Sequence, residues 1–100
     1  MIKLFIILTM IVTGFCDDSC GKVPSDMAYG IMASGEQTYR GAIACPSWLP
    51  LGTILFVEGE RFICEDRGGA IRGNRINIWF STCREATEWG KQEKKVIILK

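Results

Sequence analysis

The stretch EDRGGAIRGNRINIW, residues 65–79, decides the fold that the sequence predicts. Its first part is rich in glycine, so backbone geometry rather than side-chain packing dominates there. Its second part places Ile76 and Ile78 on one face and polar residues between them, which is the alternation of a half-buried strand. We therefore predict a glycine-rich loop over residues 66–73 that leads directly into a strand over residues 75–80.

Short strands are also predicted on both sides of this stretch. They cover residues 27–33, 41–45, 53–57, 61–64 and 94–99, and the third and fourth flank a Glu-Gly-Glu turn that is typical of a hairpin. One helix is predicted after Thr82, because Thr82 and Glu85 have the spacing of a capping box and Gly90 is a suitable stop. Six short strands with one helix imply a mainly β fold, a small closed or nearly closed barrel.

The composition excludes several classes of function. The chain has 100 residues and no histidine, so it is one domain without a Ser-His or Cys-His nucleophile pair or a His-ligated metal. Its 12 basic and 11 acidic residues give a net charge of +1, which lacks the basic footprint of a nucleic-acid-binding protein. We expect no cofactor, no metal and no nucleic acid partner.

The N-terminal residues have the pattern of an export signal. A short start with Lys3 precedes an apolar run over residues 4–15, which is shorter than the roughly 20 residues of a membrane span. We predict residues 1–16 as a signal peptide, residues 17–26 as a lead-in segment and residues 27–100 as the barrel. The mature chain would have no transmembrane segment and would be secreted, periplasmic or in the cell envelope. The alternative is an ordinary N-terminal strand or helix that is buried.

Five cysteines support an oxidising compartment. Cleavage after Cys16, or its lipidation as an anchor, leaves an even set, namely Cys20, Cys45, Cys64 and Cys83. This favours two disulfides, with three pairings open. A zinc site is disfavoured because no two cysteines lie two to four residues apart, apart from the pair that surrounds the cleavage site.

The order of motifs along the chain resembles that of a known family. The motifs are ASGE (33–36), ACP (44–46), LPLGT (49–53), the 65–79 stretch, EA (85–86) and WG (89–90). This order is similar to the 3D domain, named for three aspartates, in the double-psi β-barrel superfamily with rare lipoprotein A-like proteins and membrane-bound lytic transglycosylase A. The resemblance covers about residues 27–99. It implies a six-stranded barrel that acts on the glycan of the bacterial cell wall.

The sequence departs from this family at two of its three aspartates. Cys45 stands in place of the first, Asp66 keeps the second, and Asn77 replaces the third. A histidine that many relatives carry before the Leu-Pro turn is also missing. The position of Cys45, together with Cys64 just before Asp66, favours a Cys45–Cys64 disulfide in place of the lost carboxylate, with Cys20–Cys83 as the second.

The resemblance implies that Asp66 is the catalytic residue of a lytic transglycosylase. This reaction needs one acid, because the 6-hydroxyl of the muramyl sugar replaces water as the nucleophile, whereas hydrolysis ordinarily needs two carboxylates. Peptidoglycan glycan strands would be the partner, and the residues expected to bind them are Asn77, Arg67, Arg72, Asn74 and Trp79. Trp89 is expected in the core, while Trp48 and Tyr39 are further aromatic candidates for stacking.

Several alternatives remain open at this point. Asp66 could be structural, accepting backbone N–H bonds within its own loop. Glu36 and Glu65 are alternative acids, or solvated surface carboxylates. The barrel could also be a non-catalytic module that binds glycan, or a secreted interaction protein.

Overall fold

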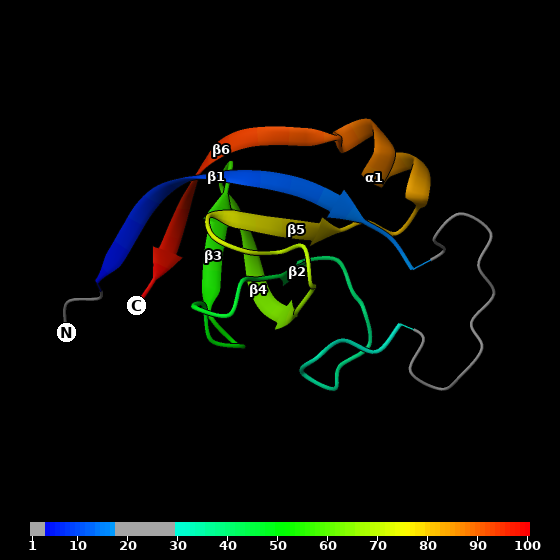
Figure 1. The fold of residues 1–100 in the computed structure, drawn as a ribbon, viewed down its shortest axis with the longest axis horizontal. Helices are drawn as coiled ribbons and strands as arrows, with labels where there is room; N and C mark the ends of the chain where they lie inside the picture. The colour runs from blue at the N-terminus through cyan, green and yellow to red at the C-terminus, as the bar shows by residue number, and fades with distance from the viewer. Residues whose placement is uncertain (1–3, 18–29) are drawn as a thin grey trace.

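The chain folds into a closed barrel of six strands with one short helix. The computed structural model describes residues 4–17 and 30–100 (Figure 1). Its elements in chain order are β1 (Phe5–Phe15), β2 (Ala42–Ala44), β3 (Ile54–Val57), β4 (Glu60–Asp66), β5 (Arg75–Trp79), α1 (Cys83–Trp89) and β6 (Lys91–Leu99). Around the barrel the strands follow the order β1-β5-β2-β4-β3-β6. The mainly β fold with one helix is confirmed.

Alternation along the strands builds the core. In β5, Ile76 and Ile78 are buried while the residues between them are half-buried, as the alternating pattern predicts. Leu55 from β3 and Ile98 from β6 join them, with exposures of 0% and 1%. Because each strand contributes its inward face, the interior is filled by branched aliphatic side chains and carries no buried charge among the described residues.

The first strand is not the one that the sequence indicates. Residues 5–15, predicted as part of a signal peptide, form β1, which pairs in parallel with β5 and antiparallel with β6. Met10 and Val12 point into the core, with exposures of 1% and 0%. The barrel therefore begins at residue 5, and the predicted boundary at residue 27 differs from the structure. The apolar run forms an N-terminal strand, as in the alternative, but only Met10 and Val12 are fully buried, and residues 4–7 are exposed.

The described part of the predicted strand over residues 27–33 does not belong to a barrel strand. Residues 27–29 lie outside the described residues, as does most of the predicted lead-in segment, and among residues 30–33 only Ile31 makes an isolated bridge, to Gln37. The other predicted strands are confirmed. The hairpin of β3 and β4 pairs Val57 with Glu60 across a turn in which Glu58 has a positive φ of 51°.

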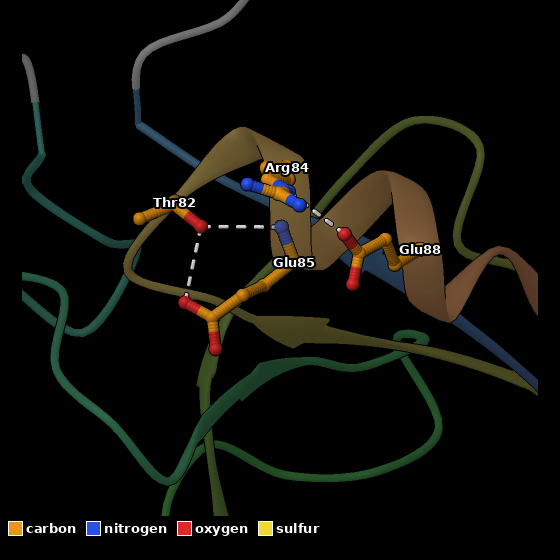
Figure 2. Close-up of polar contacts among 4 residues, drawn as sticks. All are labelled: Thr82, Arg84, Glu85 and Glu88. Carbon is orange, nitrogen blue, oxygen red and sulfur yellow. Dashed lines mark hydrogen bonds and ion pairs between the residues drawn. The ribbon is translucent and has the colours of Figure 1, made fainter.

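The helix begins and ends where the capping signals predict. Thr82 accepts a hydrogen bond from the Glu85 backbone N–H at 3.1 Å, and its hydroxyl donates to the Glu85 carboxylate at 3.0 Å (Figure 2). Arg84 and Glu88 form an exposed ion pair one turn apart. Gly90 ends the helix with φ at 68°, a conformation that favours glycine. Within the described residues, no helix has the length and apolarity to cross a membrane.

Replacing the N-cap should destabilise the protein measurably. Thr82→Ala removes the acceptor for the Glu85 N–H, which should lower the free energy of unfolding by about 1 kcal/mol. Thr87→Ala is the matched control, because Thr87 is exposed inside the same helix, where alanine has the higher helix propensity. Urea unfolding of both variants measures the difference. Equal midpoints for the two would contradict the capping role.

Two disulfides join distant parts of the chain. Cys45 and Cys64 are bonded as predicted, with a Cα–Cα distance of 5.7 Å, and both are fully buried. Cys83 pairs with Cys16, at a Cα–Cα distance of 5.1 Å, so the predicted Cys20–Cys83 pairing is wrong. Cys16 directly follows β1, and Cys83 opens α1. The bond joins the end of β1 to the start of α1. Because the Cys16 sulfur is in this disulfide, it is not available for the lipid anchor considered above.

Candidate functional site

Asp66 is the last residue of β4 and is half-buried beside the glycine-rich loop. Its Oδ1 accepts hydrogen bonds from the backbone N–H of Arg67, at 2.8 Å, and of Ala33, at 3.0 Å. The Ser34 backbone N–H donates in turn to the Glu65 carbonyl at 2.8 Å. The segment around residue 33 is thereby fixed against the end of β4, and one carboxylate oxygen of Asp66 is used in holding it there.

Asn77 lies at the same level of the barrel as Asp66, with one strand between them. Ala44 of β2 pairs with Asp66 on one side and with Asn77 on the other. Two strand spacings place the backbones of Asp66 and Asn77 about 10 Å apart. The Asn77 side chain turns toward β1, where its Oδ1 accepts from the Thr13 hydroxyl at 2.9 Å. The two side chains are therefore held by different partners.

An open groove runs beside the glycine-rich loop, on the side of Arg67. We call it the Trp48 groove; it is lined by Cys45, Pro46, Ser47, Trp48, Arg67, Gly68, Gly69, Ile71, Arg72 and Gly73. The Trp48 ring is 45% exposed, and its Nε1–H donates to the Gly73 carbonyl at 2.8 Å. An indole held in this way presents a fixed apolar face beside charged side chains, which suits the C–H faces of a sugar ring.

The two arginines of the loop differ in their freedom to bind a ligand. Arg67 donates to the carbonyls of Cys45 and Pro46, at 3.1 and 2.8 Å, so its guanidinium braces the loop against the strand that carries the disulfide. Arg72 is exposed and lines the groove, and its Nε donates to the Gly69 carbonyl at 2.7 Å. The exposed Asn74 follows the groove-lining residues, and its carbonyl accepts from Ile11 N.

A second open groove includes Glu65, the residue before Asp66. It is lined by Ser34, Glu36, Tyr39, Leu51, Gly52 and Glu65, and we call it the acidic groove. The Tyr39 hydroxyl donates to the Glu65 carboxylate at 2.5 Å. Burial, this hydrogen bond and the negative charges of Glu65 and Glu36 raise the pKa of Tyr39 to about 12, although Arg61 acts in the opposite direction. Tyr39 is therefore a hydrogen-bond donor at neutral pH, and both alternative acids line the same groove.

Trp79 lies apart from both grooves. It lines a smaller pocket of about 130 Å³ together with Arg40, Phe80 and Trp89 and neighbouring residues of the β3–β4 hairpin. Trp79 and Asn77 alternate with the buried isoleucines along β5, but Trp79 does not line either of the two grooves near the Asp66 loop. Trp89 packs against the core as predicted, and its Nε1–H donates to the Val12 carbonyl at 3.0 Å. Trp48 is the groove aromatic, and its turn position before Pro50 is the signal that could have singled it out.

The glycine-rich loop and most of the barrel match a known protein family. Residues 41–100, from β2 through β6, match the 3D domain. The chain belongs to the 3D domain family. The match includes Asp66, the glycine-rich loop and the Trp48 groove, so the resemblance drawn from the motifs is confirmed.

Two curated proteins of Bacillus subtilis (strain 168) are similar to this 3D domain chain. One, YabE, is named for cell wall shaping and is 32% identical over 82 residues, which cover 81% of this chain and 20% of YabE. The other, the cell wall-binding protein YocH, is 29% identical over 93 residues, which cover 92% of this chain and 32% of YocH. The chain thus spans a third or less of each relative.

Solved structures of a lytic transglycosylase share the barrel. MltA from Escherichia coli matches with a TM-score of 0.57 and 26% identity, over 69% of this chain and 27% of MltA. MltA with bound chitohexaose matches with a TM-score of 0.59 and 26% identity, again over 69% of this chain and 27% of the other. About 69% of this chain thus has a structural counterpart within a larger lytic transglycosylase.

Proposed function

We propose that the chain acts on peptidoglycan outside the cytoplasm, binding glycan strands in the Trp48 groove and cleaving them by lytic transglycosylation with Asp66 as the single acid and base. The observation that carries this is the position of Asp66, at the junction of β4 and the glycine-rich loop that forms the groove. Support comes from the relatives, named for cell wall shaping and binding, and from the MltA barrel. The two disulfides fit an oxidising, extracytoplasmic compartment.

The proposed reaction uses the two oxygens of Asp66 differently. Oδ1 is held by the Ala33 and Arg67 N–H groups, so Oδ2 would carry the proton to the glycosidic oxygen. As the bond to that oxygen breaks, the carboxylate would accept the proton of the muramyl 6-hydroxyl, whose oxygen attacks the anomeric carbon. The product is a 1,6-anhydro end. The two N–H groups would stabilise the negative charge on the carboxylate between these steps.

Glycan binding without cleavage is the second candidate. Three observations favour it: Asp66 has backbone donors on one oxygen, Cys45 is locked in a disulfide, and Asn77 lacks the charge of the family aspartate. The exposed Trp48 face and Arg72 would then suffice for binding, by stacking and by hydrogen bonds to sugar hydroxyls. The name of YocH, a cell wall-binding protein, also fits a binding module.

Asp66→Asn should abolish glycan cleavage while leaving binding intact. The asparagine keeps an acceptor oxygen for the Ala33 and Arg67 N–H groups, so the loop should hold its shape, but it cannot donate and then accept a proton. The experiment is digestion of purified peptidoglycan by residues 1–100 with both disulfides formed, with products identified by mass spectrometry. Anhydro-muramyl products from the native chain, lost in Asp66→Asn, are the expected result.

Two further variants sharpen this test. Glu65→Gln should leave the anhydro products unchanged, because its carboxylate serves Tyr39 in the acidic groove. Asn77→Asp restores a family carboxylate and should increase the yield, since Thr13 can still donate to it. No products from folded native protein that sediments with cell walls would favour the binding module. Reducing-end products would instead indicate hydrolysis by a second carboxylate.

A further inference from the structure

The N-terminal half of β1 has a neighbour on one side only. β6 pairs with β1 from Phe5 to Thr13, whereas β5 begins at Arg75, opposite Ile11. In Figure 1 this part of β1 runs beside the end of β6, whose other edge pairs with β3 at residues 96–98. Within residues 4–17 and 30–100, no strand pairs with the second edge of residues 5–9. We call this edge the open edge.

The backbone groups that face the open edge follow from the ladder. Alternate residues of a strand point their N–H and C=O groups to the same side. Ile11 N donates to the Asn74 carbonyl, on the β5 side, while the Leu4 carbonyl accepts from Lys100 N, on the β6 side. The β1–β6 register runs without a bulge. Phe5, Ile7 and Thr9 therefore present their N–H and C=O groups to the open edge.

The side chains around the open edge are apolar and exposed. Leu4 is 68% exposed, Phe5 58% and Ile7 52%, and the neighbouring Ile97 of β6 is 36% exposed. Residues 4–15 contain no charged residue and no proline, and the ladder has no bulge. Charged side chains, proline and bulges are among the devices that protect edge strands from pairing with another chain. Residues 5–9 have none of these three, so their open edge is suited to pair with another strand.

We propose that a second copy of the chain occupies the open edge, with the two β1 strands antiparallel about a two-fold axis at Ile7. Ile7 then lies opposite the partner's Ile7, and Phe5 opposite the partner's Thr9. These are hydrogen-bonded pairs of an antiparallel ladder, so all three N–H groups of each copy find a carbonyl. A one-residue shift would turn the wrong groups toward each other, which fixes the register.

Charge and exposure both favour a second copy as the occupant. The segment is uncharged from residue 4 to residue 15, so bringing two copies together opposes no like charges. The exposed side chains of Phe5 and Ile7 in the two copies would meet at the axis and would bury apolar surface there. The contact is isologous and uses the open edge of both copies, so assembly ends at the dimer. It leaves the Asp66 loop uncovered and is independent of the proposed function.

Sedimentation equilibrium of the full chain tests the proposal. The native protein should have twice the mass of one chain. Ile7→Lys and Ile7→Glu should each be monomeric, because each places two like charges across the axis. An equimolar mixture of the two variants should recover the dimer, since lysine then faces glutamate. Ile31→Lys, at an isoleucine that is 42% exposed elsewhere, is the matched control and should remain dimeric.

The mixture makes the test specific for this register. A native protein that is monomeric at every concentration would overturn the proposal, as would dimers of the two single variants or a mixture that stays monomeric. Co-sedimentation with phosphatidylcholine vesicles provides the competing outcome. A chain that is monomeric in solution, binds these vesicles and loses binding in Ile7→Lys would assign the patch to a lipid surface and overturn the dimer.

Discussion

A chain without residues 1–16 should fail to form the barrel. β1 closes the barrel between β5 and β6, so its removal exposes one edge of each of these strands. It also takes Met10 and Val12 out of the core, where both are almost fully buried. Burial of two such side chains contributes on the order of 3–6 kcal/mol, which is a large part of the stability of a small domain.

The losses extend to the helix. Cys83 would lack Cys16, and the Trp89 indole would lack the Val12 carbonyl. Gly14 lies where α1 crosses β1, so close that an added Cβ would come within 2.7 Å of the Phe80 ring. Since the helix packs on β1 at this glycine, it would lose the surface on which it rests.

Circular dichroism and thermal unfolding of residues 17–100 measure the effect. The expected result is a spectrum without the native strand signal and no cooperative transition. Removal of residues 1–4 is the control, because Leu4 is mostly exposed and only its carbonyl takes part in the ladder, so this shorter deletion should unfold cooperatively. A cooperative transition of residues 17–100 near the native midpoint would show that β1 is dispensable and would restore the signal-peptide prediction.

The sequence predicts the fold class correctly but not the first strand, and the apolar run over residues 4–15 is the reason. This run has the length of the hydrophobic region of a signal peptide, but it can also form a strand with one buried face, and hydropathy alone does not distinguish the two. The partners of β1 lie 60 residues or more along the chain, at Arg75–Trp79 and Lys91–Leu99. The hairpin and the helix caps depend on neighbouring residues, which is why these were predicted to within a residue or two.

The candidate site was predictable in part for a related reason. The loop that carries Asp66 is contiguous, so its motif is visible in the sequence. The pocket of Trp79 and the groove of Trp48 are each built from segments that are distant in the sequence. Strand alternation gives a face of a strand but not what covers that face. The Cys16–Cys83 disulfide likewise depends on the position of β1. The prediction of residues 1–16 as a signal peptide left Cys16 out of the pairing, and this led to the wrong Cys20–Cys83 disulfide.

Loss of the Cys45–Cys64 disulfide should have the second largest effect. The bond joins β4 to the residue that follows β2, and both cysteines are at 0% exposure within the core. Its 19-residue separation corresponds to about 3 kcal/mol of chain entropy, and replacing both sulfurs by alanine leaves a void that adds to the cost. Cys45→Ala with Cys64→Ala should therefore lower the free energy of unfolding by about 3–5 kcal/mol.

The position of this bond gives the variant a local signature as well. Cys45 N donates to the Asp66 carbonyl at 3.0 Å, and Arg67 donates to the Cys45 carbonyl. Greater mobility of residue 45 should therefore weaken the hydrogen bonds that hold Asp66 and Arg67 in place. Hydrogen exchange at the backbone N–H of residue 45 should be faster in the Cys45→Ala, Cys64→Ala variant than in the native chain. Cys16→Ala with Cys83→Ala is the comparison: it should also lower stability, through a loop of 67 residues, but leave exchange at residue 45 slow. Equal protection of this amide in both double variants would mean that the buried disulfide stabilises the barrel without positioning Asp66.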